Sequence, residues 1–180
     1  DEPTSIAFSD IHEHWAEENI KHAIRMGIVK GYPDDTFTPG NPVTRAEFTV
    51  LLANTLKLEG DGTELTFLDS DEIGEWAKQS VAQAVGAGLI KGYEDHTFRP
   101  NALITRAEMA VMVGKALDIP MEENRSTRFA DDGDIPVLAK DAVATLQKYD
   151  YLAGLGDNKF HPHSYTTRVE AAVVLLKLLS

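Results

Sequence analysis

Three arginines occupy the same place in a short motif that occurs three times, as Thr-Arg-Ala-Glu at 44–47 and 105–108 and as Thr-Arg-Val-Glu at 167–170. A Thr three residues before a Glu, followed by an apolar run, is typical of a capping box at a helix start. The capping box explains the Thr and the Glu. It does not explain the Arg, because a cation at the positive end of a helix dipole is unfavourable by roughly a few tenths of a kcal/mol. The arginines are Arg45, Arg106 and Arg168.

Two interpretations of these arginines are open from the residues alone: each binds an anionic ligand, or each forms an intramolecular salt bridge with a neighbouring acid. The chain has 17 Lys and Arg against 29 Asp and Glu, which gives a formal net charge of −12. Nonspecific binding to nucleic acid or to an anionic membrane surface relies on a basic face, so this charge argues against both partners. An anionic ligand must instead be met by a few locally placed Arg and Lys side chains.

The chain has 180 residues, of which 43% are hydrophobic, enough for one well-buried core. It contains no run of about 18 apolar residues, so we expect no membrane insertion. Its first residues lack the basic and apolar regions of a signal peptide, and we expect any export signal to have been removed already. The chain has no cysteine, so the sequence offers no disulfide and no thiolate metal site.

The motif lies within a longer repeat of about sixty residues. In the first copy, Ile20, Ala23 and Ile24 recur at helical spacing and are followed by a loop rich in Gly, Pro and Asp. The motif then begins a second helix, over about 46–58, that is apolar on nearly every side. Such units cannot bury their apolar faces alone and must stack on their neighbours. The repeats are predicted at 6–59, 65–119 and 127–180.

The last predicted helix, 169–179, is the most apolar of the three second helices. An open stack of repeats would end in a polar capping face, so this composition favours a closed arrangement. We therefore predict an all-α fold in which three tandem helix–loop–helix repeats close into a pseudo-threefold trimer with a central three-helix bundle and three prongs. Each second helix is expected to pack against the other two and against its own first helix. Residues 1–180 are expected to form a single cooperative domain.

The aromatic, glycine and motif residues together resemble the S-layer homology (SLH) domain family. The resemblance rests on Phe-x-Asp, His-Trp-Ala at 14–16, Gly-Ile-Val-Lys-Gly-Tyr at 27–32, Phe-x-Pro at 37–39 and the Thr-Arg-Ala-Glu motif. It implies a module that anchors exported proteins noncovalently to the cell wall, at the bacterial cell surface or in an S-layer. The implied partner is an anionic secondary cell-wall polysaccharide linked to peptidoglycan, commonly ending in pyruvate-ketal N-acetylmannosamine and bound in grooves between prongs.

By this resemblance the arginines read the carboxylate of the pyruvate ketal, which suits a planar guanidinium group. The loop glycines would let the sugar approach the backbone, and the aspartates would accept hydrogen bonds from sugar hydroxyls. The aromatic residues would offer an apolar wall, and the lysines would add charge. The expected ligand-binding residues are Arg45, Arg106, Arg168, Gly31, Gly92, Gly154, Lys30, Lys91, Asp10, Asp69, Asp131, Trp15, Trp76, Tyr32 and Tyr93.

The third repeat departs from the first two at three of these positions. Ala153, Leu155 and Leu138 stand where the earlier copies have Lys, Tyr and Trp. The groove that depends on the loop of the third repeat is therefore predicted to be the weakest, and the sequence does not show which neighbouring repeat completes it. One or two ligands per chain are predicted rather than three, and Arg168→Ala is predicted to cost less binding than Arg45→Ala or Arg106→Ala. These arginine substitutions are expected to leave thermal stability nearly unchanged.

Some of these residues also have a purely structural interpretation. Trp15 and Trp76 begin the apolar stripe of the first helices, so core packing is favoured for both. The aspartates of the Phe-x-Asp segments fit turn or N-cap roles equally well. His161-Pro162-His163 is interpreted as surface.

Two acidic loop segments, 34–35 and 131–134, suggest calcium. Neither has the spacing of an EF-hand, and turn chemistry explains both better, so we predict no metal site. A calcium-dependent structural or protein-interaction module of the cell surface is the alternative function.

The motifs indicate neither an enzyme nor a cofactor. The sequence has no phosphate loop, Rossmann fingerprint or nucleophile elbow, and the three motif glutamates are engaged as capping residues. A polar constellation that is repeated three times suits multivalent binding better than a single active site. The sequence thus predicts a non-enzymatic anchoring module that is monomeric when isolated.

Overall fold

The computed structural model describes residues 8–117, 120–121 and 126–179, and this part of the chain is helical without named β-strands. None of its helices has the length and apolar character needed to cross a bilayer. The predicted all-α class is therefore confirmed. The helices are α1 (Glu17–Arg25), α2 (Arg45–Leu56), α3 (Glu75–Gly86), α4 (Arg106–Ala116), α5 (Val137–Lys148) and α6 (Arg168–Leu178), with short 3-10 turns at Ser70–Glu72 and Asp132–Asp134.

The three predicted capping boxes begin α2, α4 and α6. In α2 the Glu47 N–H donates to Thr44 Oγ1 at 3.1 Å, and the Glu47 carboxylate accepts the Thr44 N–H at 3.3 Å. The same reciprocal pair is present at the starts of α4 and α6. Each box places the following arginine at the first helical position, so all three arginines start from equivalent points of the backbone.

The first helices of the repeats end at a residue in the left-handed region. Gly27 follows α1 with φ 77° and Gly88 follows α3 with φ 76°, as their place after the apolar stripe predicts. In the third repeat Asp150 takes this conformation with φ 60°. The less favourable residue therefore keeps the same turn.

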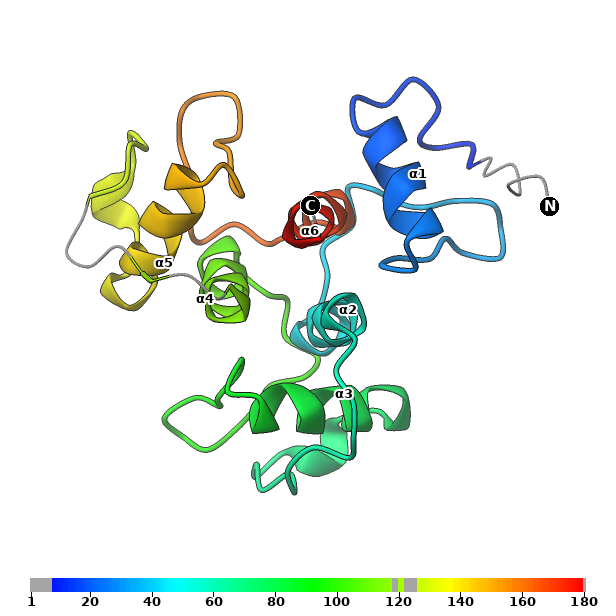
Figure 1. Cartoon of the computed structure of the whole chain (residues 1–180), viewed down its shortest axis with the longest axis vertical. Coiled ribbons are helices and arrows are strands. Elements are labelled where there is room, and N and C mark those ends of the chain that lie inside the picture. The colour runs from blue at the N-terminus through cyan, green and yellow to red at the C-terminus, as the bar shows by residue number, and fades with distance from the viewer. Residues whose placement is uncertain (1–7, 118–119, 122–125, 180) are drawn as a thin grey trace.

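Each second helix packs against the first helix of the next repeat. The main helix pairs are α2 with α3, α4 with α5, and α6 with α1, as Figure 1 shows. The prediction that each second helix packs against its own first helix is therefore wrong. The apolar stripes require that each helix be covered, but both connections are long enough to reach either neighbour, so the stripes do not select the partner.

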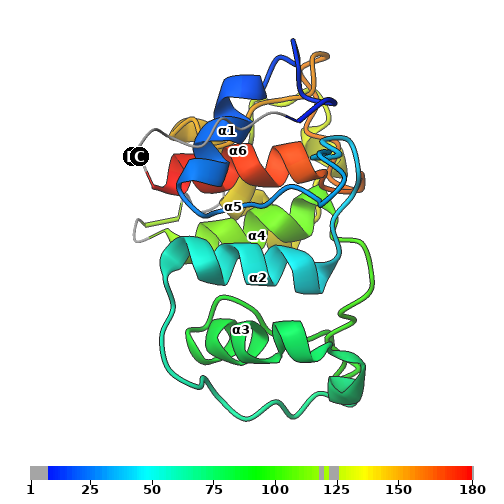
Figure 2. The same ribbon diagram turned by 90° about the vertical axis from the view of Figure 1, so that its right-hand side faces the viewer.

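Short antiparallel backbone bridges join all three repeats at the starts of α2, α4 and α6. Among these second helices α2 and α6 contact each other directly, and Figure 2 shows α2, α4 and α6 running alongside one another. The bridges pair Thr44 with Leu103, Thr105 with Tyr165, and Pro42 with Thr167. The hydrogen bonds thus lead from the first repeat to the second, from the second to the third, and from the third back to the first.

One hydrophobic core runs through all three repeats. Its fully buried side chains include Phe48 of α2, Met109 of α4 and Leu175 of α6. In each loop a buried phenylalanine also packs on the ring of the Phe-x-Asp segment, and the pairs are Phe8–Phe37, Phe67–Phe98 and Phe129–Phe160. Because no repeat keeps its helix partner within itself, we expect none to be stable alone.

We therefore expect the whole chain to unfold in one calorimetric transition. A fragment covering residues 65–124 keeps α3 and α4 but loses α2 and α5, which cover them, so it should be unfolded by circular dichroism. Two resolved transitions, or a folded and soluble fragment, would contradict a single cooperative unit.

Candidate functional site

Each motif arginine reaches out of its own repeat and into the loop of another. The Nε of Arg45 donates to the Phe98 carbonyl at 2.9 Å. The same atom of Arg106 donates to the Phe160 carbonyl at 2.7 Å, and that of Arg168 to the Phe37 carbonyl at 2.7 Å. Each guanidinium also lies over the ring of that phenylalanine. The arginines therefore link the repeats in the order one to two, two to three, and three to one.

Two of the arginines form buried ion pairs with the capping glutamate of the next repeat. Arg45 Nη1 lies 2.8 Å from Glu108 Oε2, and Arg106 Nη1 contacts Glu170 Oε2. Arg45 is 6% exposed and Arg106 is 2% exposed. The alternative of an intramolecular salt bridge thus describes these two side chains, and their contact with a ligand carboxylate stays a prediction.

Arg168 differs from the other two arginines. Its Nη2 donates to the Lys30 carbonyl at 2.7 Å, and its guanidinium lies 4.8 Å from the centre of the Tyr32 ring. Within the described residues it forms no ion pair with Glu47, the acid that corresponds to Glu108 and Glu170. Arg168 is also only partly buried. Of the three guanidinium groups, it therefore keeps the most capacity to meet an external anion.

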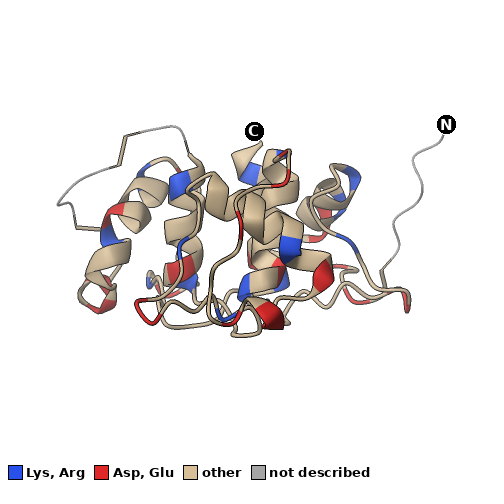
Figure 3. Cartoon of the chain, turned by 90° about the horizontal axis from the view of Figure 1, so that it is seen from below, with Lys and Arg blue, Asp and Glu red and all other residues tan. Residues whose placement is uncertain are grey.

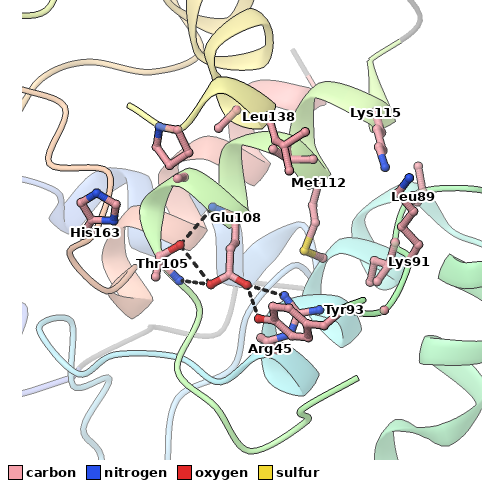
Figure 4. Close-up of a pocket in the computed structure, with 16 residues that line it drawn as sticks. Arg45, Leu89, Lys91, Tyr93, Thr105, Glu108, Met112, Lys115, Leu138 and His163 are labelled. Atoms are coloured by element: carbon pink, nitrogen blue, oxygen red, sulfur yellow. Dashed lines mark hydrogen bonds and ion pairs between the residues drawn. The ribbon is translucent and has the colours of Figure 1, made fainter. Parts of the chain in front are cut away.

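The Arg45 site contains a short hydrogen-bonded network. The Tyr93 hydroxyl donates to Glu108, the acid that also pairs with Arg45 (Figure 4). Burial, followed by this hydrogen bond, raises the pKa of Tyr93 to about 12. Burial also raises the pKa of Glu108, but the hydrogen bonds from Tyr93 and Thr105 and the Arg45 charge leave it below its usual value. The network is therefore an ionised pair capped by a neutral phenol.

A pocket of about 590 Å³ opens beside this network. Residues 89–93 of the second repeat form one wall, α4 forms the floor, and Leu138 at the start of α5 borders it. Arg45 of the first repeat also lines it. The pocket therefore combines all three repeats, and it brings together four of the predicted residues: Arg45, Lys91, Gly92 and Tyr93.

This arrangement shows which loop each motif arginine meets, on which the predicted ranking of the three sites depends. Arg168 lies with the loop of repeat one, which has Lys30 and Tyr32. Arg106 lies with the loop of repeat three, where its Nη2 donates to the Ala153 carbonyl at 3.4 Å. Arg168 thus does not share the poorer loop of its own repeat, because each arginine crosses to the following repeat. The relative binding cost of Arg168→Ala stays a prediction.

The three aspartates of the Phe-x-Asp segments hold the loops in place. Asp69 accepts the N–H groups of Phe98 and Arg99, both at 2.8 Å. Asp10 and Asp131 bind the equivalent pairs of N–H groups in their own repeats. Burial raises the pKa of Asp10 and Asp131, but these hydrogen bonds leave both pKa values below the usual one. The turn role is therefore present in all three copies, and hydrogen bonding to a sugar stays a prediction.

The loop glycines are required by packing inside each repeat. A Cβ on Gly31 would lie 2.1 Å from the Phe8 ring, and one on Gly92 would lie 2.6 Å from the Phe67 ring. A Cβ on Gly154 would lie 3.1 Å from the Lys159 carbonyl oxygen. These Cβ positions point into the fold. Space for a ligand is thus not needed to explain the glycines, and backbone contact with a sugar stays a prediction.

The two tryptophans are exposed, so the favoured interpretation of core packing is wrong. Trp15 is 74% exposed and Trp76 is 62% exposed. Leu138, at the equivalent position of the third repeat, is 92% exposed and borders the pocket. Apolar spacing did not reveal that each tryptophan faces solvent while the alanine that follows it, Ala16 or Ala77, is buried. The indoles are therefore free to meet a ligand.

Sequence reasoning missed two charged residues of the pocket, Glu108 as a partner of Arg45 and Lys115 in the last turn of α4. The spacing of these residues could have indicated that they line one surface, because Glu108, Met112 and Lys115 follow one another at intervals of four and three residues. Residues at this spacing share one face of a helix.

The comparisons with known proteins agree with this geometry. The chain matches the model of the S-layer homology domain three times, at residues 7–49, 66–110 and 128–172. The chain belongs to the S-layer homology domain family. These three SLH matches fall on the three repeats that the sequence analysis recognised.

Curated relatives carry the same SLH region within much longer proteins. An exoglucanase XynX of Acetivibrio thermocellus is 35% identical over 97% of this chain. A cellulosome-anchoring protein of the same species is 39% identical over 64% of the chain, and the S-layer protein sap of Bacillus anthracis is 32% identical over 92%. The chain spans 16%, 27% and 20% of the lengths of these three relatives.

The ion pairs predict unequal effects of the arginines on stability. Arg106→Ala should lower the free energy of unfolding by about 3–5 kcal/mol, because it leaves the Glu170 carboxylate buried without its cation. Arg168→Ala should cost only about 1–2 kcal/mol, since the partners it loses are carbonyls beside a partly exposed side chain. Urea denaturation of both variants measures the difference, and equal losses would contradict the assignment. The expectation of nearly unchanged stability is withdrawn for Arg45 and Arg106.

The Tyr93 network predicts a specific dependence of stability on alkaline pH. The pKa of this phenol is higher in the folded chain than the value of about 10 for a free tyrosine. Its contribution to stability is therefore complete below about pH 10 and is lost as the pH rises to about 12. The ultraviolet absorbance of tyrosinate should show one late-titrating group that is missing in Tyr93→Phe. An unchanged titration curve in that variant would show that Tyr93 is not the protected phenol.

Proposed function

We propose that this chain holds a longer exported protein on the bacterial cell wall by binding an anionic secondary cell-wall polysaccharide in grooves between its repeats. The observation that carries this proposal is the pocket beside Arg45. Three cations, Arg45, Lys91 and Lys115, line it, although the chain as a whole carries a net charge of −12. Figure 3 shows acidic segments, in red, recurring along the chain between the basic ones. Attraction for an anion is thus confined to particular grooves.

The coarser function follows from the family. The chain is a cell-surface anchoring module, because it consists of SLH repeats and its relatives include a cellulosome-anchoring protein and an S-layer protein. The finer proposal is the ligand itself, the pyruvate-ketal N-acetylmannosamine end of a polymer linked to peptidoglycan. One carboxylate on a compact sugar matches one guanidinium beside an aromatic ring.

Among the three grooves, the one that contains Arg168 has the best composition for a single carboxylate. Arg168 there lies beside Lys30 and over Tyr32, and its guanidinium is not neutralised by a capping glutamate among the described residues. By correspondence with Leu138 in the Arg45 pocket, we propose that the exposed Trp76 is the apolar residue of this site. A guanidinium beside an aromatic ring suits an acidic pyranose.

Catalysis is not part of the proposed function of this chain. The glutamates of the three motifs accept backbone N–H groups of the capping boxes, and two of them also pair with arginines. Activities named for relatives such as the exoglucanase would then belong to the rest of those proteins, of which this region is a minor part. We propose that the isolated module acts as a monomer.

The acidic loops are engaged in turns, which supports a polysaccharide ligand over calcium. Asp34 accepts the Thr36 N–H at 3.1 Å, and Asp132 accepts the Thr127 N–H at 2.7 Å. Within the described residues no three His, Cys, Asp or Glu side chains gather as a metal site would require.

Cosedimentation with isolated cell walls tests the proposal. The chain should bind intact walls, bind equally in EDTA, and lose binding once the secondary polymer has been extracted. Arg168→Ala should weaken wall binding by about 1.5–3 kcal/mol through loss of a charge-assisted pair. Arg25→Ala removes the same charge from an exposed position in the last turn of α1 and should have no effect. Release by EDTA, or undiminished binding to stripped walls, would contradict the proposed ligand.

A further inference from the structure

The pocket beside Arg45 has a second charged end that the motif does not explain. Lys91, from the loop of the second repeat, and Lys115, from the last turn of α4, both line it. Figure 4 shows their ammonium groups directed toward one another, on the far side of Met112 from the Arg45–Glu108 pair. Two cations held together repel each other, so this arrangement calls for a compensating negative charge.

The rest of the pocket does not supply that charge. Glu108 is the one carboxylate in the lining, and Arg45 already neutralises it at 2.8 Å. Within the described residues neither lysine forms an ion pair. The apolar side chains of Leu89, Ile90 and Met112 border the same space. Lys91 and Lys115 are both solvent-exposed, so they lie at the open edge of the pocket. Partial burial first, and then the charge of Lys91, lowers the pKa of Lys115.

The lysine pair is particular to this groove. In the first repeat the residue at the position of Lys115 is Asn54, although Lys30 corresponds to Lys91. In the third repeat Lys177 corresponds to Lys115, but Ala153 takes the place of Lys91, and Lys177 donates to the Asp150 carbonyl at 3.0 Å. The fold of a repeat therefore does not require both lysines, and among the three copies the second is the one that has both.

We propose that Lys91 and Lys115 form a receptor for a doubly charged anionic group, either a phosphate monoester or two neighbouring carboxylates, at the end of the groove away from Arg45. The inference rests on the proposed function, because the group would be carried by the wall polymer. The inference also assigns a different anionic group to each of the two sites. The Arg168 groove reads a single carboxylate through a guanidinium, and this groove reads two negative charges through two ammonium groups.

Titration calorimetry of the whole chain with inorganic phosphate and with acetate, at one ionic strength, tests the receptor. Phosphate at a pH where it is a dianion should bind more tightly than acetate. Lys91→Gln and Lys115→Gln should each weaken phosphate binding about tenfold or more, since one of two charge-assisted contacts is lost. Lys159→Gln removes an exposed lysine outside the pocket lining and should leave phosphate binding unchanged. If wild type and both pocket variants bound phosphate equally well, the proposed receptor would be wrong.

Wall binding distinguishes this inference from the proposed function. Both lysine variants should keep wall attachment through the other grooves but bind intact walls more weakly than wild type, and free phosphate should compete only for the lysine-dependent part. If phosphate binds through the lysines while wall binding is the same in wild type and variants, the polymer does not use the receptor and this inference is wrong, although anchoring stands. If no variant or wild-type protein binds walls, anchoring itself fails.

Discussion

The structure depends on a side chain that leaves its own repeat. Each capped helix presents an arginine at its first position, and that guanidinium binds a loop carbonyl of the following repeat. In two cases it also pairs with the next capping glutamate, so one glutamate closes its own helix start and receives a neighbour's cation. Helix capping and contact between repeats are therefore coupled, because both use residues of the Thr-Arg-Ala-Glu motif.

This coupling determines what a groove is made of. The arginine comes from one repeat, the loop with Lys, Gly and Tyr from the next, and the exposed apolar residue from the repeat after that, as in the pocket of Arg45, Tyr93 and Leu138. Residues of all three repeats therefore line the Arg45 pocket, so a substitution in any repeat can change it. The same crossing gives the grooves different electrostatics, because Glu108 and Glu170 neutralise Arg45 and Arg106 whereas Arg168 has no such partner among the described residues.

Local features of the fold could be predicted from the sequence because they depend on neighbouring residues. Capping boxes, apolar stripes and Gly-rich loops act over a few positions, and the helices begin at Arg45, Arg106 and Arg168 as those patterns indicate. The pairing of helices could not be predicted, since an apolar stripe is equally well covered by either neighbour. The loop that each arginine meets could not be predicted for the same reason, and Arg168 meets Lys30 and Tyr32 rather than Leu155.

Side-chain direction was the second property beyond reach of the sequence. Trp76 begins an apolar stripe yet is exposed, whereas its neighbour Ala77 in the same turn of α3 is buried. Gly31 was assigned to a ligand, whereas its missing Cβ makes room for Phe8 inside the repeat. In both cases the outcome depends on which side of the backbone faces solvent, and the spacing of residue types does not fix that side.

The central claim is that motif arginines act between repeats rather than within them, and a pair of double-mutant cycles tests it most directly. Free energies of unfolding would be measured for Arg45→Met, Glu108→Gln and the double variant, and for the same arginine combined with Glu47→Gln of its own motif. The structure predicts a coupling of about 1–3 kcal/mol between Arg45 and Glu108, and one within about 0.5 kcal/mol of zero between Arg45 and Glu47. A larger coupling within the motif than across the repeats would contradict this account.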